Sequence, residues 1–271
     1  MKFLAVAALL VFSLQAQEQT TMGRVSFEVA SIKPTVDAGN HRPIRFSVSP
    51  GGQLTVANMP LHWLIANAYN LPFQSLRLTG GPGWVKSEPY DIQAVAPGMF
   101  TPGISARERE ARTRLMLQTL LAERFGLVIR RETREVPAYA MVEAKRGSKL
   151  ERAGIVEKDC PAQPPDSGLY CHHLDGGMGR GLHGPAVDMA DLAQFAENWM
   201  DRPVVDETGI LGLYKIETEG WTTLTAGPEG SDPDKASVFT VFEQRLGLKL
   251  EPRKTKVEMF VIERVERPSA N

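Results

Sequence analysis

Apolar residues recur with helical spacing in two parts of the chain that lie 131 positions apart. Both sets follow the i, i+3, i+4, i+7, i+8 pattern that gives a helix one buried face. The first set is Leu61, Leu64, Ile65, Ala68 and Tyr69, and the second is Leu192, Phe195, Ala196, Trp199 and Met200. The pattern therefore predicts two equivalent helices, one in each half of the chain.

A second pair of helices is predicted at a different spacing. Ser105 and Glu108 form a capping box at the start of a long helix over about 106–125, and Gly126 is placed to end it. The segments "LVIRRETR" and "PAYAMVEAK" that follow are predicted to be the two strands of a hairpin. A shorter helix ending at Gly247 and the segments "LKLEP" and "VEMFVIERVE" repeat this order.

The passage around the first glycine occurs twice. "RFGLVIRRETREVPAYAMV" (124–142) aligns without a gap with "RLGLKLEPRKTKVEMFVIE" (245–263). The shared positions are Gly126/Gly247, Leu127/Leu248, Ile129/Leu250, Val136/Val257 and Tyr139/Phe260. Charged positions mostly differ, as where Glu132 aligns with Arg253 and Glu135 with Lys256. Duplicated chemistry is expected to keep its polar groups, so we interpret this passage as scaffold.

The predicted fold class is α+β. Its basis is two tandem copies of a small helix–strand–helix–hairpin unit, which form mixed or antiparallel sheets with the helices packed on one face. The predicted boundaries are 24–146 for the first half, 147–182 for a Gly/Pro/Cys-rich connector and 183–268 for the second half. Function is then expected in the loops that the two halves do not share.

The first 16 residues predict export. Lys2 precedes an apolar run from Phe3 to Leu14, and Ala16 is a suitable last residue before cleavage, so 1–16 is predicted to be a signal peptide. The run is shorter than the about 20 residues that a transmembrane helix needs. We therefore predict a periplasmic or secreted protein with no membrane span after cleavage. The formal net charge of −1 gives no sign of a nucleic-acid partner.

Cys160 and Cys171 are the only cysteines. In an oxidising compartment, two cysteines on either side of a Pro/Gly/Ser-rich loop most simply form one local disulfide. The alternatives are free thiols or a metal site that adds His172, His173 and His183. The cysteine spacing is wider than the short paired spacing that zinc sites favour, so it fits a metal site poorly.

Several segments together resemble a known family of exported bacterial proteins. They are "FEVASIKP", "GGQLTVANMPLHWLIANAY", "GGPGW", "YDIQA", "LLAERFGLVIRRETREVPAYAMV" and "RPVVDETGILGLYKIE". This soil-associated family is defined by a domain of unknown function and has no established catalytic residues. Some of its members are fused to membrane zinc peptidases, but no HExxH motif occurs here. A weaker similarity links 190–216 to the short N-terminal interaction modules of secretins and TonB-dependent receptors.

Candidate chemistry is sparse. His172, His173 and His183, with Asp175 between them, could bind a metal ion, whereas the alternative is an exposed Gly-rich connector. No G-x-S-x-G motif or nucleotide-binding glycine loop is present. Asp201, Asp206 and Glu207 could act as acid or base, but Asp206–Gly209 has the composition of a turn before a strand.

The sequence therefore favours an exported, non-enzymatic module without a cofactor that binds an envelope or extracellular protein. Exposed strand edges would allow a partner segment to add a strand. The candidate contacts are Gly81, Pro82, Gly83, Trp84, Asp206 and Gly209. Core packing is the alternative for Trp84. The rival functions are a metal-dependent hydrolase that uses the His-rich connector, and a small-ligand or glycan-binding protein with a pocket between its halves.

Overall fold

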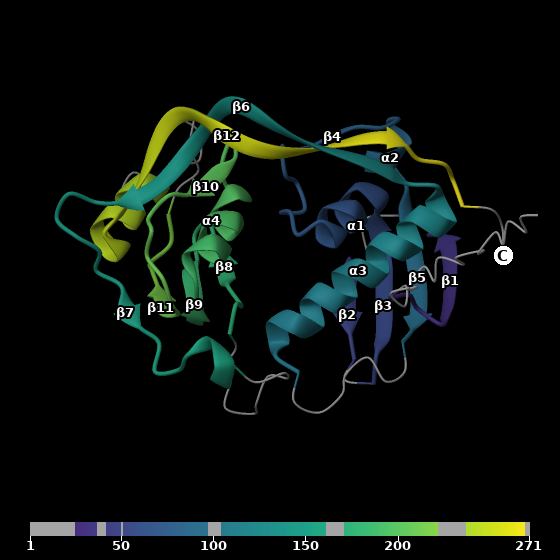
Figure 1. The fold of residues 1–271 in the computed structure, drawn as a ribbon, viewed down its shortest axis with the longest axis horizontal. Coiled ribbons are helices and arrows are strands. Elements are labelled where there is room, and N and C mark those ends of the chain that lie inside the picture. Colours follow the sequence, from purple (N-terminus) through teal and green to yellow (C-terminus); the bar gives the residue numbers. More distant parts are fainter. Residues whose placement is uncertain are drawn as a thin grey trace, which may run out of the picture.

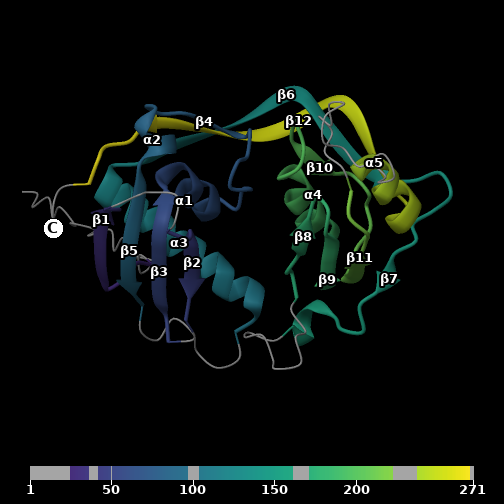
Figure 2. The ribbon, with the colours of Figure 1, turned by 180° about the vertical axis from the view of Figure 1, so that it is seen from behind.

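The computed structural model describes residues 25–36, 42–49, 51–96, 104–160, 171–221 and 237–268, so the predicted signal peptide lies outside the described residues. These residues form two lobes joined by a long two-stranded ribbon, at the top of Figure 1 and of the reverse view in Figure 2. Helices combine with three mixed or antiparallel sheets, which confirms the α+β class. No helix within these ranges is long and apolar enough to cross a membrane.

The first lobe is an antiparallel sheet with helices on one face. Its strand order is β1 (Val29–Pro34), β5 (Pro89–Val95), β3 (Gln53–Pro60) and β2 (Arg45–Val48). Helices α1 (Leu61–Ala68) and α3 (Ala106–Phe125) lie on the face toward the viewer in Figure 1, and the sheet is in front of them in Figure 2. Helix α2 (Trp84–Ser87) is a single turn before β5.

Helix α3 begins and ends where its capping residues predict. The Ser105 hydroxyl accepts a hydrogen bond from the N–H of Glu108 at 3.2 Å. Gly126 takes a φ of +57°, the left-handed conformation that ends a helix most readily at glycine. Gly247, its counterpart in the second copy, takes a φ of +65° after a π-helical turn (Phe242–Leu246). The two helix ends are thus built alike.

The second lobe repeats this plan in smaller form. Its antiparallel sheet has the order β7 (Glu151–Arg152), β11 (Tyr214–Glu217), β9 (Gly181–Val187) and β8 (Asp175–Gly177). Helix α4 (Met189–Glu197) follows β9, as α1 follows β3, and α5 (Val238–Val241) leads into the π-helical turn. A 3-10 turn, η1 (Glu157–Asp159), lies in the segment that was predicted to be the connector.

The hairpin predicted inside each copy is wrong. The segment after Gly126 is one continuous strand, β6 (Val128–Glu143), and the segment after Gly247 is another, β12 (Leu248–Arg264). The two strands pair with each other in antiparallel fashion along nearly their whole length and form the ribbon. Pro137 does not interrupt β6, since it lies in the ladder opposite Lys254.

The register of the ribbon relates the two copies by a local two-fold axis. Glu135 pairs with Lys256, and these residues are also equivalent in the alignment of the two passages. The axis therefore passes through this pair. Short parallel strands flank the ribbon in equivalent places: β10 (Val204–Asp206) pairs with β6 at Tyr139, and β4 (Leu78–Gly80) pairs with β12 at Phe260.

The ribbon exchanges core residues between the lobes. Phe260 and Ile262 of the second copy are buried in the first core beside Phe125, whereas Tyr139 and Met141 of the first copy are buried in the second. The predicted domain limits divide the chain into consecutive segments. Each core instead takes residues from both copies. Neither lobe has a complete core without a strand from the other copy.

The predicted disulfide between Cys160 and Cys171 is present, with an S–S distance of 2.07 Å and both residues buried. Because the cysteines are 11 positions apart, the chain-entropy relation gives the bond roughly 3 kcal/mol of stability. We expect a Cys160→Ser, Cys171→Ser double variant to lose about that much free energy of unfolding in a urea titration without reductant. The native protein measured with reductant should match the variant; a variant as stable as the oxidised protein would contradict this assignment.

Candidate functional site

A pocket of about 280 Å³ lies between the two lobes. Its wall on the first lobe comes from the end of α1, the loop after it and α3, and its wall on the second comes from His172–Leu174 and α4. This volume is just below the range of about 300–1,000 Å³ that is usual for ligand pockets. The two lobes thus share one site of a size suited to a small molecule.

The wall on the first lobe is mainly polar. Asn67 lies in the last turn of α1, and Asn70 follows that helix with a φ of +56°. Glu110 and Arg114 are one turn apart on α3 and form an ion pair at 3.0 Å. Phe73 is 38% exposed and adds an aromatic surface. Among the hydrogen bonds of the described residues, none engages the Asn67 side chain, so its amide is available to a ligand.

The wall on the second lobe is one face of α4. Asp191, Gln194, Phe195 and Asn198 are spaced i, i+3, i+4, i+7 and line the pocket, while the opposite stripe of α4 is buried in the second core. The Gln194 amide donates across the pocket to the Asn70 side chain at 3.4 Å. Asn198 donates to the carbonyl of Phe195 at 3.1 Å, which leaves its own side-chain oxygen as an acceptor.

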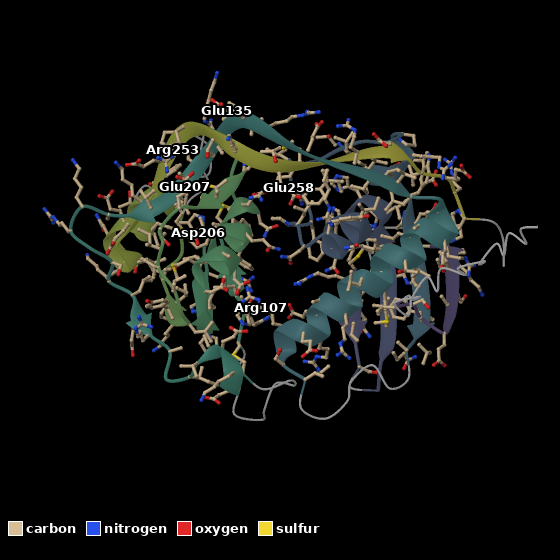
Figure 3. The ribbon with its side chains drawn as sticks, viewed as in Figure 1. Arg107, Glu135, Asp206, Glu207, Arg253 and Glu258 are labelled. Atoms are coloured by element: carbon tan, nitrogen blue, oxygen red, sulfur yellow. A yellow bond between two sulfur atoms is a disulfide. The ribbon has the colours of Figure 1, made fainter. Side chains whose placement is uncertain are left out.

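A cluster of charged residues lies beside this site, and two of its members, His172 and Asp191, line the pocket. His172 has a φ of +59°, and its imidazole Nδ1 lies 2.6 Å from Asp191 and its Nε2 2.9 Å from Glu157. From the first lobe, Arg107 forms ion pairs with Asp188 at 2.9 Å and with Glu157 at 3.7 Å. Figure 3 shows Arg107 at the start of α3, between the two lobes. The cluster is therefore an electrostatic link across the pocket.

The pKa values in the cluster follow from these contacts. The hydrogen bond with Asp191 raises the pKa of His172 above its usual value, so the imidazolium is favoured. Burial raises the pKa of Asp191, and the contact with His172 opposes this only in part. Burial also acts to raise the pKa of Asp188, but the N–H of Asp191 and the guanidinium of Arg107 outweigh it and hold that pKa low.

Stability should depend on pH through His172. Because its folded-state pKa is raised, His172 contributes stability below about 6.5, its usual pKa, and that contribution is lost as the pH rises through the raised value. We expect the urea midpoint to fall as the pH rises from about 6.5 through the raised pKa of His172, and a His172→Asn variant to show a smaller fall. Asparagine is chosen because it tolerates a positive φ. An unchanged fall in this variant would contradict the assignment.

The predicted histidine site is rearranged in the structure. His172 meets carboxylates instead of the other histidines, and its ligand atoms and those of Asp188 and Asp191 lie within 4.8 Å of one another, close enough to hold a metal ion. His183 instead pairs with Glu217 at 2.7 Å. The cysteines are committed to the disulfide. Arg107 already places a positive charge against Asp188, and this charge opposes the binding of a metal cation there.

The predicted contact residues lie away from the pocket. Trp84 is half-buried, packs against the first core and carries the guanidinium of Arg267 over its ring at 4.8 Å. A side chain at Gly81 would meet Ile262 at 3.2 Å, and Pro82 and Gly83 lead into α2. Gly81 therefore allows the close approach of β12, and Trp84 packs on the first core. Their role as partner contacts stays a prediction.

The predicted turn at Asp206–Gly209 has the geometry that its composition indicates. The Asp206 carboxylate accepts hydrogen bonds from the Thr208 N–H at 3.0 Å and the Thr208 hydroxyl at 2.8 Å. Gly209 has a φ of +67°. Glu207 points to the ribbon and pairs with Arg253, as Figure 3 shows. The Asp206 side chain is thus occupied within its own turn, and a partner role for Asp206 and Gly209 is also still a prediction.

The residues that line the pocket were not predicted from the sequence, although the sequence contains one signal for them. In the alignment that matches the apolar stripes of α1 and α4, Asn67 falls opposite Asn198. Both side chains line the pocket. A polar residue kept at equivalent positions of both copies is the pattern that we expect of duplicated chemistry, and it occurs in this helix pair and not in the ribbon.

Comparison with known proteins places this arrangement in a family without an assigned function. No curated protein and no solved structure shows significant similarity to the chain. Residues 62–265 match a family described as a protein of unknown function, DUF3738. This range begins in α1, ends after β12 and includes every residue that lines the pocket. The chain belongs to the DUF3738 family.

Proposed function

We propose that the protein is an exported, non-enzymatic binding protein that takes a small polar ligand into the pocket between its lobes. The observation that carries this proposal is the pair of amide-bearing walls, one on each lobe, with the Asn67 amide and the Asn198 oxygen free to make hydrogen bonds. Ligand pockets are commonly concave sites between domains that hold a few polar groups on a partly apolar lining. Leu71, Phe73, Leu174 and Phe195 supply that lining here.

Two features of the site support binding over catalysis. Both imidazole nitrogens of His172 are engaged by carboxylates, so this residue is poorly placed to accept a proton from a ligand. Among the described residues that line the pocket, none is a serine, threonine, cysteine or lysine. The hydroxyl, thiol and amine nucleophiles that many covalent mechanisms use are therefore not among these residues.

Export is supported by two independent features. The first is the predicted signal peptide at 1–16. The second is the disulfide, because such bonds persist in oxidising compartments and are rare in the cytosol. The ligand is then expected in the cell envelope or outside the cell.

A protein partner is a second candidate, favoured by an exposed apolar residue. Leu211 is 83% exposed and lies just after the Asp206–Gly209 turn, one of the regions predicted to contact a partner. An exposed aliphatic side chain can anchor an interface by inserting into a pocket of the partner. A Leu211→Asp variant that loses a partner captured from envelope extracts by the native protein would support this second candidate.

A thermal-shift screen followed by isothermal titration calorimetry tests the proposal. The compounds are neutral and charged cell-wall fragments, short glycans and short peptides, and each hit is measured again with an Asn67→Ala variant. We expect at least one compound to raise the melting temperature of the native protein and to bind the variant more weakly. Absence of any hit, or hits that bind the variant unchanged, would contradict the proposal. Metal analysis of the purified protein separately tests the hydrolase alternative, which requires a bound ion.

A further inference from the structure

The two copies of the duplicated unit contribute the same residue to the pocket from opposite lobes. Helices α1 and α4 occupy equivalent places, since each follows a sheet strand and precedes the short strand that flanks the ribbon. Asn67, in the last turn of α1, and Asn198, the residue that follows α4, are equivalent in the alignment and both line the pocket. A ligand that spans the pocket therefore meets an asparagine from each copy.

The charged groups in the pocket wall are already paired. Glu110 is bound to Arg114 at 3.0 Å, and Asp191 is bound to His172 at 2.6 Å. A charged ligand is held best by an opposite charge that has no other partner. Breaking the partly buried pair of Asp191 and His172 to bind such a ligand costs free energy. Glu110 and Arg114 instead neutralise each other's charge at the surface. The amides of Asn67, Gln194 and Asn198 are instead suited to uncharged groups that donate and accept hydrogen bonds.

Apolar surface lies beside these amides. Phe195 comes from α4, and Leu71, Pro72 and Phe73 come from the loop after α1. A sugar ring has hydroxyl groups around its edge and apolar C–H groups on its faces, so it matches a wall in which amides and apolar side chains alternate. A metal ion, a free phosphate or a hydrocarbon chain would each leave one of these two kinds of surface unused.

We propose that the pocket binds an uncharged oligosaccharide of at least two sugar units, with Asn67 hydrogen-bonded to one unit and Asn198 to the next. This inference rests on the proposed function and names the class of ligand. The inference predicts one ligand site per chain, not one ligand site per copy, because residues of both copies line a single pocket.

Calorimetric titration with defined sugars tests this inference. The probes are cellobiose, maltose and N,N′-diacetylchitobiose, each compared with its monosaccharide. We expect one disaccharide to bind with a stoichiometry of one per chain and more tightly than its monosaccharide. Asn67→Ala and Asn198→Ala should each weaken its binding by a similar factor of about tenfold, the effect of losing one good hydrogen bond. Gln244→Ala, which removes an exposed amide outside the pocket, should leave binding unchanged.

Each other outcome overturns a stated part of the inference. Weakening by only one of the two asparagine variants would show a one-ended ligand, and a stoichiometry of two would show separate sites. If peptides or charged fragments bind and the disaccharides do not, the ligand class is wrong while the proposed function stands. If nothing binds, both fail. Melting curves verify that the variants are folded, and Asn67→Leu and Asn198→Leu, which keep roughly the side-chain size and remove its donors and its acceptor, replace any alanine variant that is not.

Discussion

Replacing Glu197 with alanine is expected to lower the free energy of unfolding by about 3–5 kcal/mol, because it removes one partner of a buried ion pair. Glu197 on α4 is 5% exposed. Its carboxylate accepts hydrogen bonds from the Ser75 hydroxyl at 2.6 Å, from the Arg77 guanidinium at 2.5 Å and from the N–H of Val204 at 3.1 Å. Without the carboxylate, the Arg77 guanidinium keeps only the Val204 carbonyl as an acceptor at 2.6 Å, and the Ser75 hydroxyl and the N–H of Val204 lose the carboxylate as their acceptor.

The loss should be measured as the urea-dependent free energy of unfolding at neutral pH. Glu197→Gln is the matched variant, since it keeps the size of the side chain and one acceptor oxygen, and it should lose less than the alanine variant. Glu217→Ala is the control, because that carboxylate is 60% exposed and its pair with His183 lies at the surface. Equal small effects of Glu197→Ala and Glu217→Ala would contradict the assignment of Glu197 to a buried ion pair.

Replacing Phe260 with alanine is expected to cost about 3–5 kcal/mol, the usual loss for a large aromatic side chain in a core. Phe260 belongs to the second copy in the sequence, but it is 4% exposed in the first core. The local effect should therefore appear in the first lobe. Hydrogen exchange is expected to become faster in α1 and α3, which pack on that core.

Tyr139→Ala is the matched variant for Phe260→Ala, because the two residues are equivalent in the duplicated passage. Tyr139 is 7% exposed in the second core and stacks edge-on with Phe239 at 5.2 Å. Its replacement should speed exchange in α4 more than in α3. If each variant instead loosens the half of the chain to which it belongs in sequence, the exchange of core residues by the ribbon is contradicted.

The parts of the fold that depend on interactions between residues close in sequence could be predicted. Ser105 and Gly126 mark the ends of α3 because a hydroxyl cap and a left-handed glycine act within a few residues. The ribbon was not predictable in this way, since β6 pairs with a strand of the other copy, and Glu135 meets Lys256 only in the folded chain. A proline within a segment usually argues against one continuous central strand. Pro137 nevertheless lies within β6, opposite Lys254 of β12.

The candidate site was hidden for a related reason. The periodicity of α4 correctly predicts its buried stripe, including Leu192 and Ala196. The polar face that carries Gln194 and Asn198 looks like any solvated helix face until the first lobe is placed opposite it. His172 was a candidate in the sequence together with other histidines, but its partners Asp191 and Glu157 come from separate elements whose proximity depends on tertiary structure.

The central claim is that one ligand is held between the two lobes by residues of both copies. Amide chemical-shift mapping by NMR, with the disaccharide that binds most tightly added to the labelled protein, tests it most directly. The account predicts that the largest shifts fall together on the end of α1, near Asn67 and Asn70, and on α4, near Gln194 and Asn198. Shifts confined to one lobe, or centred on Trp84 or the Asp206–Gly209 turn, would contradict it.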